Sequence, residues 1–510
     1  MVSPTLSRFE LVLPNEAATQ VFASDIANAL EPGDFVTLSG DLGAGKTTFA
    51  CALIRALAND PKIAVPSPTF TLMQTYELPR FALVHADLYR LTSPDELIEL
   101  GLDDLAEGSV VLMEWPDRAE NRLPADRIDI ALALSPKHPL ERRDVTVTGY
   151  GALAQRVARV AALSQFLRNA GFEQAKRQRM QGDASTRVYE RLNLDGKPAI
   201  LMNAPRRPDG PPVRDGKPYS AIAHLAEDVK PFVAFADGLR AAGFSAPDIY
   251  AADLENGFLL LEDFGPEAFV AGSPPAPIDA RYAEAVDLLA ALHAKDLPAT
   301  LPLRGGATYT IPPYDLPAFL IEAELLLDWY IPHRGLSVGE QGRTEFRELW
   351  MQSLAPPIAG QQSWVMRDYH SPNLIWLPKR AGIARVGLLD FQDGLIGPTA
   401  YDVGSLLQDA RVDVPEPLER ELFARYVRRR AETDPAFDAA GFAALYATVA
   451  AQRATKILGI FARLDKRDGK PQYLRHMPRV WRYLQRALAH PALGNLARWY
   501  QANVPAFDGL

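Results

Sequence analysis

The glycine-rich segment at residues 40–47, GDLGAGKT, limits the possible folds of this chain more than any other feature. It fits the pattern G-x-x-x-x-G-K-[ST] and lies between an apolar run, FVTLS, and a helix-like stretch at residues 46–57. In that setting the glycines let backbone N–H groups surround phosphate oxygens, and the start of the helix adds positive potential. The segment therefore predicts a strand, a phosphate-binding loop and a helix in succession.

This loop supplies a first set of candidate nucleotide-binding residues. The Lys46 ammonium is suited to neutralise the β- and γ-phosphates of ATP, and the Thr47 hydroxyl is suited to bind Mg²⁺. The predicted binding residues are Gly40, Gly43, Gly45, Lys46, Thr47 and Thr48.

Two carboxylates follow apolar runs further along, Asp87 in VHADLYR and Glu114 in VLMEWPDR. In α/β sheets, ligands collect beyond the carboxyl ends of the strands, so both side chains could face the phosphate-binding loop. Asp87 is then a candidate Mg²⁺ ligand, and Glu114 is a candidate to orient or deprotonate the attacking water. Acidic residues at strand ends are also common in solvated turns, and the spacing alone leaves both interpretations open.

A chain of 510 residues with 48% hydrophobic residues predicts two or three domains. Alternating strand and helix signals predict an α/β domain of the P-loop NTPase type over residues 1–155. A helix-like stretch and several short strands then indicate a small β lobe at about 165–265, and long amphipathic segments indicate a large α lobe at about 275–505. This order predicts an α+β, protein-kinase-like bilobal domain over residues 160–510.

The strongest signal in the second domain is the pair of segments VMRDYHSPN and LLDFQDG. Asp368 is followed five positions on by Asn373, and Asp390 follows Asn373 by 17 residues, after an apolar run. This is the arrangement of the catalytic and metal-binding residues of kinases. We expect Asp368 to accept the proton of an acceptor hydroxyl, and Asn373 and Asp390 to bind Mg²⁺, with ATP as the phosphoryl donor.

The segment QGDASTR occupies the turn between the first two strands of the expected β lobe, where kinases cover the ATP phosphates. Small polar residues are also ordinary in hairpin turns, so this site is a weaker prediction. The candidate nucleotide-binding residues in the turn are Gly182, Ser185 and Thr186.

Four motifs of the first domain, GDLGAGKTT, SPTFTLMQTYE, HADLYRL and MEWPDR, resemble the TsaE family, formerly the YjeE ATPases. The resemblance implies ATP hydrolysis in support of threonylcarbamoyl-adenosine synthesis in tRNA, with TsaB- and TsaD-like partners through which tRNA is contacted indirectly. It implies that Asp87 and Glu114 serve hydrolysis, with Mg²⁺, and that Thr69 lies in a switch-like loop. An alternative is that the P-loop serves only as a nucleotide-dependent docking module.

In the second domain VMRDYHSPNLIWL, GLLDFQDGLIGPTAYDVGSLLQD and LLLEDFG resemble the aminoglycoside phosphotransferase group, and within it the AmgK sugar kinases. The resemblance implies ATP-dependent phosphorylation of the anomeric hydroxyl of N-acetylmuramate and N-acetylglucosamine in cell-wall recycling. It also implies that Asp402 fixes the catalytic loop and that residues 262–264, beginning with Glu262, form the hinge near adenine. The alternative that the kinase phosphorylates another small hydroxyl acceptor, such as an aminoglycoside, choline or homoserine, stays open.

Two positions depart from the kinase pattern. Met202 stands near the place where kinases usually carry a phosphate-binding Lys, and Arg187 or Arg206 is a candidate substitute. Met366 stands where many related catalytic loops carry His. Neither departure removes the proton acceptor or the metal ligands, so we expect an active enzyme.

Composition restricts the setting of these activities. A formal net charge of -9 argues against a chain that binds nucleic acid unaided, since phosphate neutralisation requires clustered Lys and Arg. The single cysteine cannot form an internal disulfide. The N-terminus lacks the features of a signal peptide, and no run of 18 apolar residues occurs, which predicts a cytoplasmic protein without a membrane span.

Overall fold

The computed structural model describes residues 6–91, 96, 108–135, 142–180 and 187–504. Its contacts divide the chain into two compact units, Met1–Asn203 and Ala204–Leu510. This division lies downstream of the boundary expected from the sequence at residues 155–160, so three strands of the expected β lobe pack with the first unit. The functional boundary at 155–160 stays a prediction.

The first unit is built on a seven-stranded mixed sheet with the order β1-β7-β6-β2-β5-β4-β3. Strands β2, β4, β5 and β6 run parallel, whereas β1, β3 and β7 pair antiparallel with their neighbours. The strands are β1 Leu6–Leu13, β2 Phe35–Ser39, β3 Met73–Glu77, β4 Ala82–Asp87, β5 Val110–Glu114, β6 Ile128–Leu134 and β7 Arg143–Tyr150. The helices are α1 Glu16–Ala29, α2 Lys46–Ala58 and α5 Ala154–Asn169, with the 3-10 helix η1 Pro116–Arg122.

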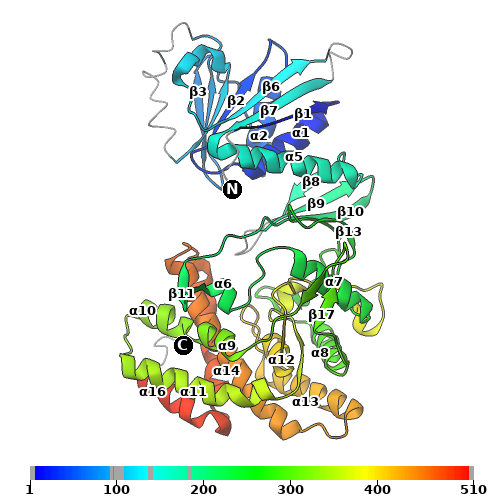
Figure 1. Cartoon of the computed structure of the whole chain (residues 1–510), viewed down its shortest axis with the longest axis vertical. Coiled ribbons are helices and arrows are strands. Elements are labelled where there is room, and N and C mark those ends of the chain that lie inside the picture. The colour runs from blue at the N-terminus through cyan, green and yellow to red at the C-terminus, as the bar shows by residue number, and fades with distance from the viewer. Residues whose placement is uncertain (1–5, 92–95, 97–107, 136–141, 181–186, 505–510) are drawn as a thin grey trace. The chain divides into compact units, whose positions relative to one another are not determined.

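Helices α1, α2 and α5 cover one face of this sheet (Figure 1). Their apolar residues, such as Phe22 and Phe49, pack with alternate strand residues such as Leu38 and Leu112. The residues between them, such as Met113, belong to a smaller core on the other face, together with Ala119 of η1. The strands that look uniformly apolar in the sequence are therefore buried on both faces, as expected for parallel strands.

Three further strands of the first unit form an antiparallel arrangement in which β9 pairs with both β8 and β10. They are β8 Lys176–Arg179, β9 Val188–Leu194 and β10 Lys197–Asn203. These are the three strands that the sequence predicts at the start of the β lobe, and their existence is confirmed.

The second unit begins with short β segments and continues into a mainly helical part. The segment at residues 203–218 is rich in Pro, Gly and charged residues, which predicts an irregular surface loop. The structure instead has a small hairpin of β11 and β12 there. The strands are β11 Pro212–Arg214, β12 Lys217–Pro218, β13 Ile249–Asp253, β14 Phe258–Glu262, β15 Val270–Ala271, β16 Ala276–Pro277, β17 Thr300–Pro302, β18 Thr308–Thr310, β19 Gln362–Val365, β20 Leu374–Trp376, β21 Val386–Leu388 and β22 Leu395–Pro398.

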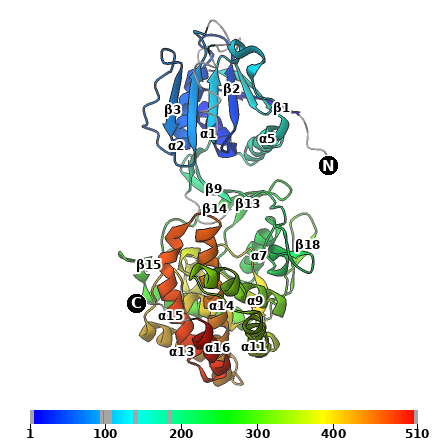
Figure 2. The ribbon, with the colours of Figure 1, turned by 90° about the vertical axis from the view of Figure 1, so that its left-hand side faces the viewer.

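The longest helix of the second unit, α14, lies against α9, α11 and α15 (Figure 2) and also contacts α12. Asp438 caps its start by accepting a hydrogen bond from the amide of Gly441 at 2.9 Å, which satisfies one free N–H of the first turn. The helices are α6 Tyr219–Ile222, α7 Lys230–Ala241, α8 Asp279–His293, α9 Leu316–Ala323, α10 Ile331–His333, α11 Glu340–Ala359, α12 Ala400–Leu407, α13 Glu416–Thr433, α14 Ala439–Lys466, α15 Met477–Leu488 and α16 Gly494–Asn503. Within the described residues, no helix is both long and apolar enough to cross a bilayer.

Candidate active sites

The P-loop joins β2 to α2, where the sequence places it, and its glycines have conformations that other residues disfavour. Gly40 has a φ of 133°, and a Cβ atom there would lie 2.1 Å from the carbonyl oxygen of Leu132 on β6. Gly45 has a φ of 104° and caps the start of α2. A side chain at either position would strain the loop, and at Gly40 it would also clash with the sheet.

Lys46 turns back onto its own loop. Its Nζ donates hydrogen bonds to the carbonyl oxygens of Gly40 and Asp41, at 2.7 and 2.9 Å, and lies 3.6 Å from the centre of the Trp115 ring. Burial lowers the pKa of Lys46, although the carboxylates of Glu114 and Asp87 oppose this shift. The ammonium is thus held beside the loop that the sequence predicts to bind phosphate.

The two candidate carboxylates lie at neighbouring strand ends, as predicted, because β4 and β5 pair in parallel with Asp87 opposite Glu114. Oε2 of Glu114 accepts a hydrogen bond from the Thr47 hydroxyl at 2.9 Å. Oδ2 of Asp87 accepts one from the Thr69 hydroxyl at 2.9 Å, and Oδ1 accepts one from the amide of Tyr89 at 3.0 Å. The structure thus brings together the P-loop hydroxyl, both carboxylates and the loop that carries Thr69.

The oxygen groups at this site have the chemistry that Mg²⁺ requires. Thr47 provides a hydroxyl at the start of α2, and Asp87 provides a carboxylate. Among the described residues no cluster of three His, Cys, Asp or Glu side chains could hold a metal alone. A bound Mg²⁺ would therefore rely on phosphate and water oxygens as well, which is usual for this ion in nucleotide sites.

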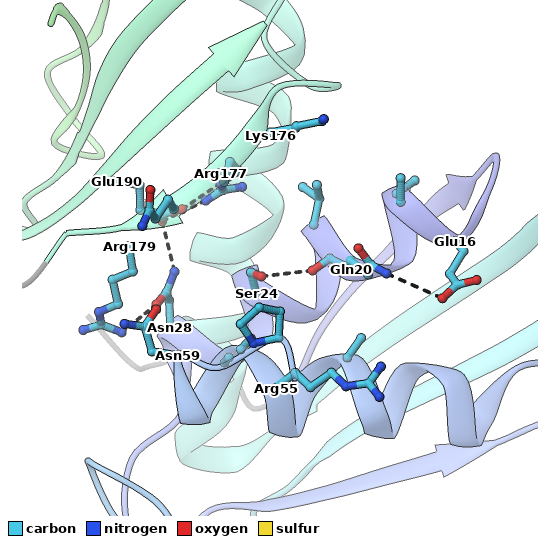
Figure 3. Close-up of a pocket in the computed structure, with 18 of the residues that line it drawn as sticks. Glu16, Gln20, Ser24, Asn28, Arg55, Asn59, Lys176, Arg177, Arg179 and Glu190 are labelled. Atoms are coloured by element: carbon cyan, nitrogen blue, oxygen red, sulfur yellow. Dashed lines mark hydrogen bonds and ion pairs between the residues drawn. The ribbon is translucent and has the colours of Figure 1, made fainter. Parts of the chain in front are cut away.

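A groove of about 830 Å³ runs between α1, α2 and β8 within the first unit (Figure 3). Thr48 lines it near the start of α2, where the sequence places a nucleotide-binding residue. Near the C-terminal end of α1, Asn28 donates a hydrogen bond to Oε1 of Glu190 at 3.0 Å and accepts one from Arg179 at 2.6 Å. The binding role of Thr48 stays a prediction.

Beside this groove a buried ionic cluster joins α1 to β8 and β9. The Arg177 guanidinium lies 2.5 Å from Oδ1 of Asp25 and 2.8 Å from Oε2 of Glu190, and all three side chains are at most 5% exposed. Burial raises the pKa of Asp25 to about 6; Arg177 opposes this shift, and the second carboxylate, Glu190, adds to it. One guanidinium thus serves two buried carboxylates.

In the second unit a short hairpin sets the distance between two predicted metal ligands. Strand β20 pairs antiparallel with β21, and Leu374 lies opposite Leu388. Asn373 therefore lies at the end of the hairpin where Asp390 follows, and the Asn373 amide is 3.4 Å from Oδ2 of Asp390. The same amide donates a hydrogen bond to the backbone carbonyl of Asp368 at 2.9 Å. The predicted trio is thus brought together.

The carboxylate of Asp402 holds the catalytic loop, as the resemblance implies. It accepts hydrogen bonds from the backbone amides of Met366 and Arg367, at 2.6 and 2.9 Å, and it is completely buried. Met366, which departs from the expected His, takes part through its backbone, so the substitution leaves this contact intact. Burial raises the pKa of Asp402 to about 7, against the effect of the two amides.

Arg367, the residue before the predicted base, has a φ of 71° and is held by a buried charge cluster. Its guanidinium pairs with Glu322 on α9, and Lys456 on α14 lies 2.8 Å from the same carboxylate. Burial opposes ionisation of Asp368, but Lys456 and other nearby cations outweigh it and hold the pKa of Asp368 below its ordinary value. This charge environment favours an ionised proton acceptor.

The remaining predicted nucleotide contacts stay predictions. Gly182, Ser185 and Thr186 lie outside the described residues. Glu262 ends β14, where its amide donates to the carbonyl of Asp248 and its carboxylate accepts from Arg380 at 2.7 Å, so a hinge role stays a prediction. Met202 is buried, and Arg206 pairs with Glu227 at 3.3 Å on the surface. Within the part of the chain that the structure describes, no contact of Met202 or Arg206 identifies a substitute for the phosphate-binding Lys, and Arg187 stays a candidate.

Comparison with known proteins identifies both parts. A model of the phosphotransferase enzyme family, APH, matches residues 176–445, which is more than half of the chain. A model of threonylcarbamoyl adenosine biosynthesis protein TsaE matches residues 13–144. The chain belongs to both families. The predicted fold classes, a P-loop α/β domain followed by a phosphotransferase of the kinase type, are therefore confirmed.

Individual relatives match one part each. The chain is 39% identical over 360 residues to N-acetylmuramate/N-acetylglucosamine kinase of Caulobacter vibrioides, a match that covers 68% of this chain and 97% of the relative. It is 36% identical to the Pseudomonas aeruginosa protein of the same name, over 62% of this chain and 84% of the relative. It is 41% identical to the tRNA threonylcarbamoyladenosine biosynthesis protein TsaE of Rickettsia bellii, over 24% of this chain and 86% of the relative.

Several residues of this TsaE and phosphotransferase fusion emerge only from the structure. In the TsaE part, His85 contacts Glu114, and Asp25 belongs to the cluster around Arg177. In the phosphotransferase part, Glu322 and Lys456 support the catalytic loop. His85 opens the motif HADLYRL, which carries the resemblance but assigns this residue no role, and Lys456 stands in an expected helix with no signal of its own. Their partners are distant in sequence, so only the fold reveals the contacts.

Proposed function

We propose that the phosphotransferase part transfers the γ-phosphoryl group of ATP to the anomeric hydroxyl of N-acetylmuramate and N-acetylglucosamine. The observation that carries this proposal is the position of the Asn373 amide between the Asp368 carbonyl and the Asp390 carboxylate. The relatives named as kinases of these two sugars support the choice of acceptor.

In this reaction the acceptor oxygen forms a bond to the γ-phosphorus, and the bond to the oxygen between the β- and γ-phosphorus atoms breaks, which releases ADP. The proton of the acceptor hydroxyl passes to the Asp368 carboxylate, which its cationic neighbours keep ionised. Asn373 and Asp390 would hold Mg²⁺, which supplies neutralisation of the phosphate charge. Asp402 and Glu322 keep the catalytic loop in place around the base.

The test is ATP-dependent phosphorylation of both sugars by the intact protein and by an Asp368→Asn variant, with products resolved by phosphorus NMR. An anomeric phosphate formed by the parent and lost in the variant is the expected result. Absence of product with both sugars contradicts the assignment, and an aminoglycoside, choline or homoserine then becomes the acceptor to test.

For the TsaE part we propose ATP hydrolysis that supports threonylcarbamoyl-adenosine formation in tRNA. Thr47 and Asp87 would hold Mg²⁺ there, and Glu114 orients or deprotonates the attacking water. TsaB- and TsaD-like proteins are its proposed partners, tRNA is contacted through them, and the cytoplasm is the proposed compartment. The name of the Rickettsia bellii relative supports the pathway.

The alternative, a P-loop that only docks on partners when nucleotide is bound, predicts a different response. Glu114→Gln should abolish hydrolysis and retain nucleotide binding if the TsaE part acts through catalysis. If modification of tRNA by the reconstituted partner proteins is unaffected by this variant, the docking function replaces the catalytic one.

A further inference from the structure

His85 is a buried residue that the motifs leave without a function. It lies on β4, two residues before Asp87, and its side chain is completely buried. Its Nε2 lies 3.0 Å from Oε1 of Glu114 on the neighbouring strand β5. A buried histidine commonly satisfies core packing alone, but the partner of this one is the carboxylate proposed to act on the attacking water.

The Glu114 carboxylate is held from two sides. Oε1 faces His85, and Oε2 accepts the hydrogen bond of the Thr47 hydroxyl at 2.9 Å. Because an ionised carboxylate oxygen only accepts, Nε2 of His85 must carry the hydrogen. The other ring nitrogen, Nδ1, is buried and has no hydrogen-bond partner among the described residues. Glu114 is thus the one polar contact of the imidazole in this part of the structure.

We propose that His85 is a positioning residue for ATP hydrolysis, which fixes the orientation of the Glu114 carboxylate by donating a hydrogen bond from Nε2. The inference rests on the proposed role of Glu114. It requires no change in the charge of the imidazole, because a neutral ring with hydrogen on Nε2 makes the contact.

The physical basis is the cost of a misplaced catalytic group. With Nε2 removed, one oxygen of a buried carboxylate loses its donor, and among the described residues the Thr47 hydroxyl is then the one side-chain hydrogen-bond partner that orients Glu114. A displacement of about 1 Å at a catalytic centre can lower a rate by about 100-fold. Nucleotide affinity should change little, because within the described residues the His85 ring makes no hydrogen bond to the P-loop backbone or to Lys46.

Three variants test the proposal, each in a full-length Asp368→Asn background so that the kinase site does not consume ATP. His85→Leu removes the donor, His85→Gln replaces it with an amide that can reach the same oxygen, and Glu114→Gln removes the carboxylate. ATP hydrolysis gives kcat and KM. Binding of a fluorescent ATP analogue, after subtraction of the binding that a Lys46→Ala control retains at the kinase site, gives the Kd of the P-loop site.

We expect His85→Leu to lower kcat by about 100-fold with KM and Kd within about 3-fold of the parent, and His85→Gln to recover at least 10-fold of the loss. If His85→Leu hydrolyses ATP like the parent while Glu114→Gln is inactive, the inference fails and the role of Glu114 stands. If Glu114→Gln also keeps parental kcat, the proposed role of Glu114 fails first. Equal losses in His85→Leu and His85→Gln, together with lost nucleotide binding, assign His85 to folding and overturn the proposal.

Discussion

The side-chain amide of Asn373 donates a hydrogen bond to the backbone carbonyl of Asp368 over 2.9 Å, so one predicted metal ligand also supports the loop of the predicted base. Asn373→Ala should therefore lower the kcat of sugar phosphorylation by about 100-fold, through loss of both the metal ligand and the loop contact. Asn495→Ala, on the exposed face of α16, is the matched control. Equal kcat in the two variants would remove Asn373 from the catalytic site.

Lys456 should set the pH dependence of the kinase from a position 88 residues beyond the base. Because its positive charge helps to hold the pKa of Asp368 low, Lys456→Met should raise that pKa. Asp368 acts only when it is ionised, so the acid limb of the kcat/KM profile should move to higher pH. Lys466→Met, on the exposed end of the same helix, should leave the limb in place. An unchanged limb in Lys456→Met contradicts this account.

Arg177→Met should destabilise the intact protein, because the buried carboxylates of Asp25 and Glu190 would both lose their positively charged partner. Removal of one partner from a buried ion pair costs about 3–5 kcal/mol. The exposed pair of Arg168 and Glu173 offers a control, since loss of a surface pair costs at most about 1 kcal/mol. The urea midpoint of Arg177→Met should lie well below that of Arg168→Met. Similar midpoints would mean that the buried cluster adds little to the free energy of unfolding.

The raised pKa of Asp25 should make the free energy of unfolding depend on pH. Its pKa rises from an ordinary 3.8 to about 6 in the folded protein, so the folded state holds this proton more tightly than the unfolded state. The stabilisation that this proton gives is present below about pH 4 and is lost as the pH rises through 6, a loss of about 3 kcal/mol.

The thermal midpoint Tm of the parent and of Asp25→Asn should be compared from pH 4 to pH 7. The Asn side chain does not titrate in this range, so the Tm of the parent should fall relative to that of the variant between pH 4 and 6. Above pH 6 the difference between the two Tm values should stay constant. A difference that does not change with pH contradicts the raised pKa.

Much of both sites was predictable because the relevant signals are local in sequence. The P-loop occupies eight adjacent positions, and its strand and helix follow from short patterns. The carboxylates Asp87 and Glu114 were expected at strand ends, and the parallel pairing of β4 with β5 brings them together. Asp368, Asn373 and Asp390 could be found by spacing, since a single hairpin connects them.

Other features could not be predicted because they depend on contacts between distant segments. No element was predicted before residue 35, so β1 and α1 were missed, and with them Asp25, one of the two partners of Arg177. The hairpin of β11 and β12 is a different case, because its signal is local: residues 203–218 were expected to be irregular, yet the two strands pair around Asp215 and Gly216. The positive φ values of these two residues, 48° and 71°, suit a tight hairpin turn.

The sequence by itself determined the two families, the order of the two folds and the principal candidate residues of each site, because these depend on residue types at fixed local spacing. Only the tertiary structure decided which side chains support them: His85 beside Glu114, Glu322 beside Arg367, and Asp25 beside Arg177. Each of these contacts joins different strands or helices and is buried. A buried polar group needs a partner wherever the fold brings one within reach, and no local pattern encodes that choice.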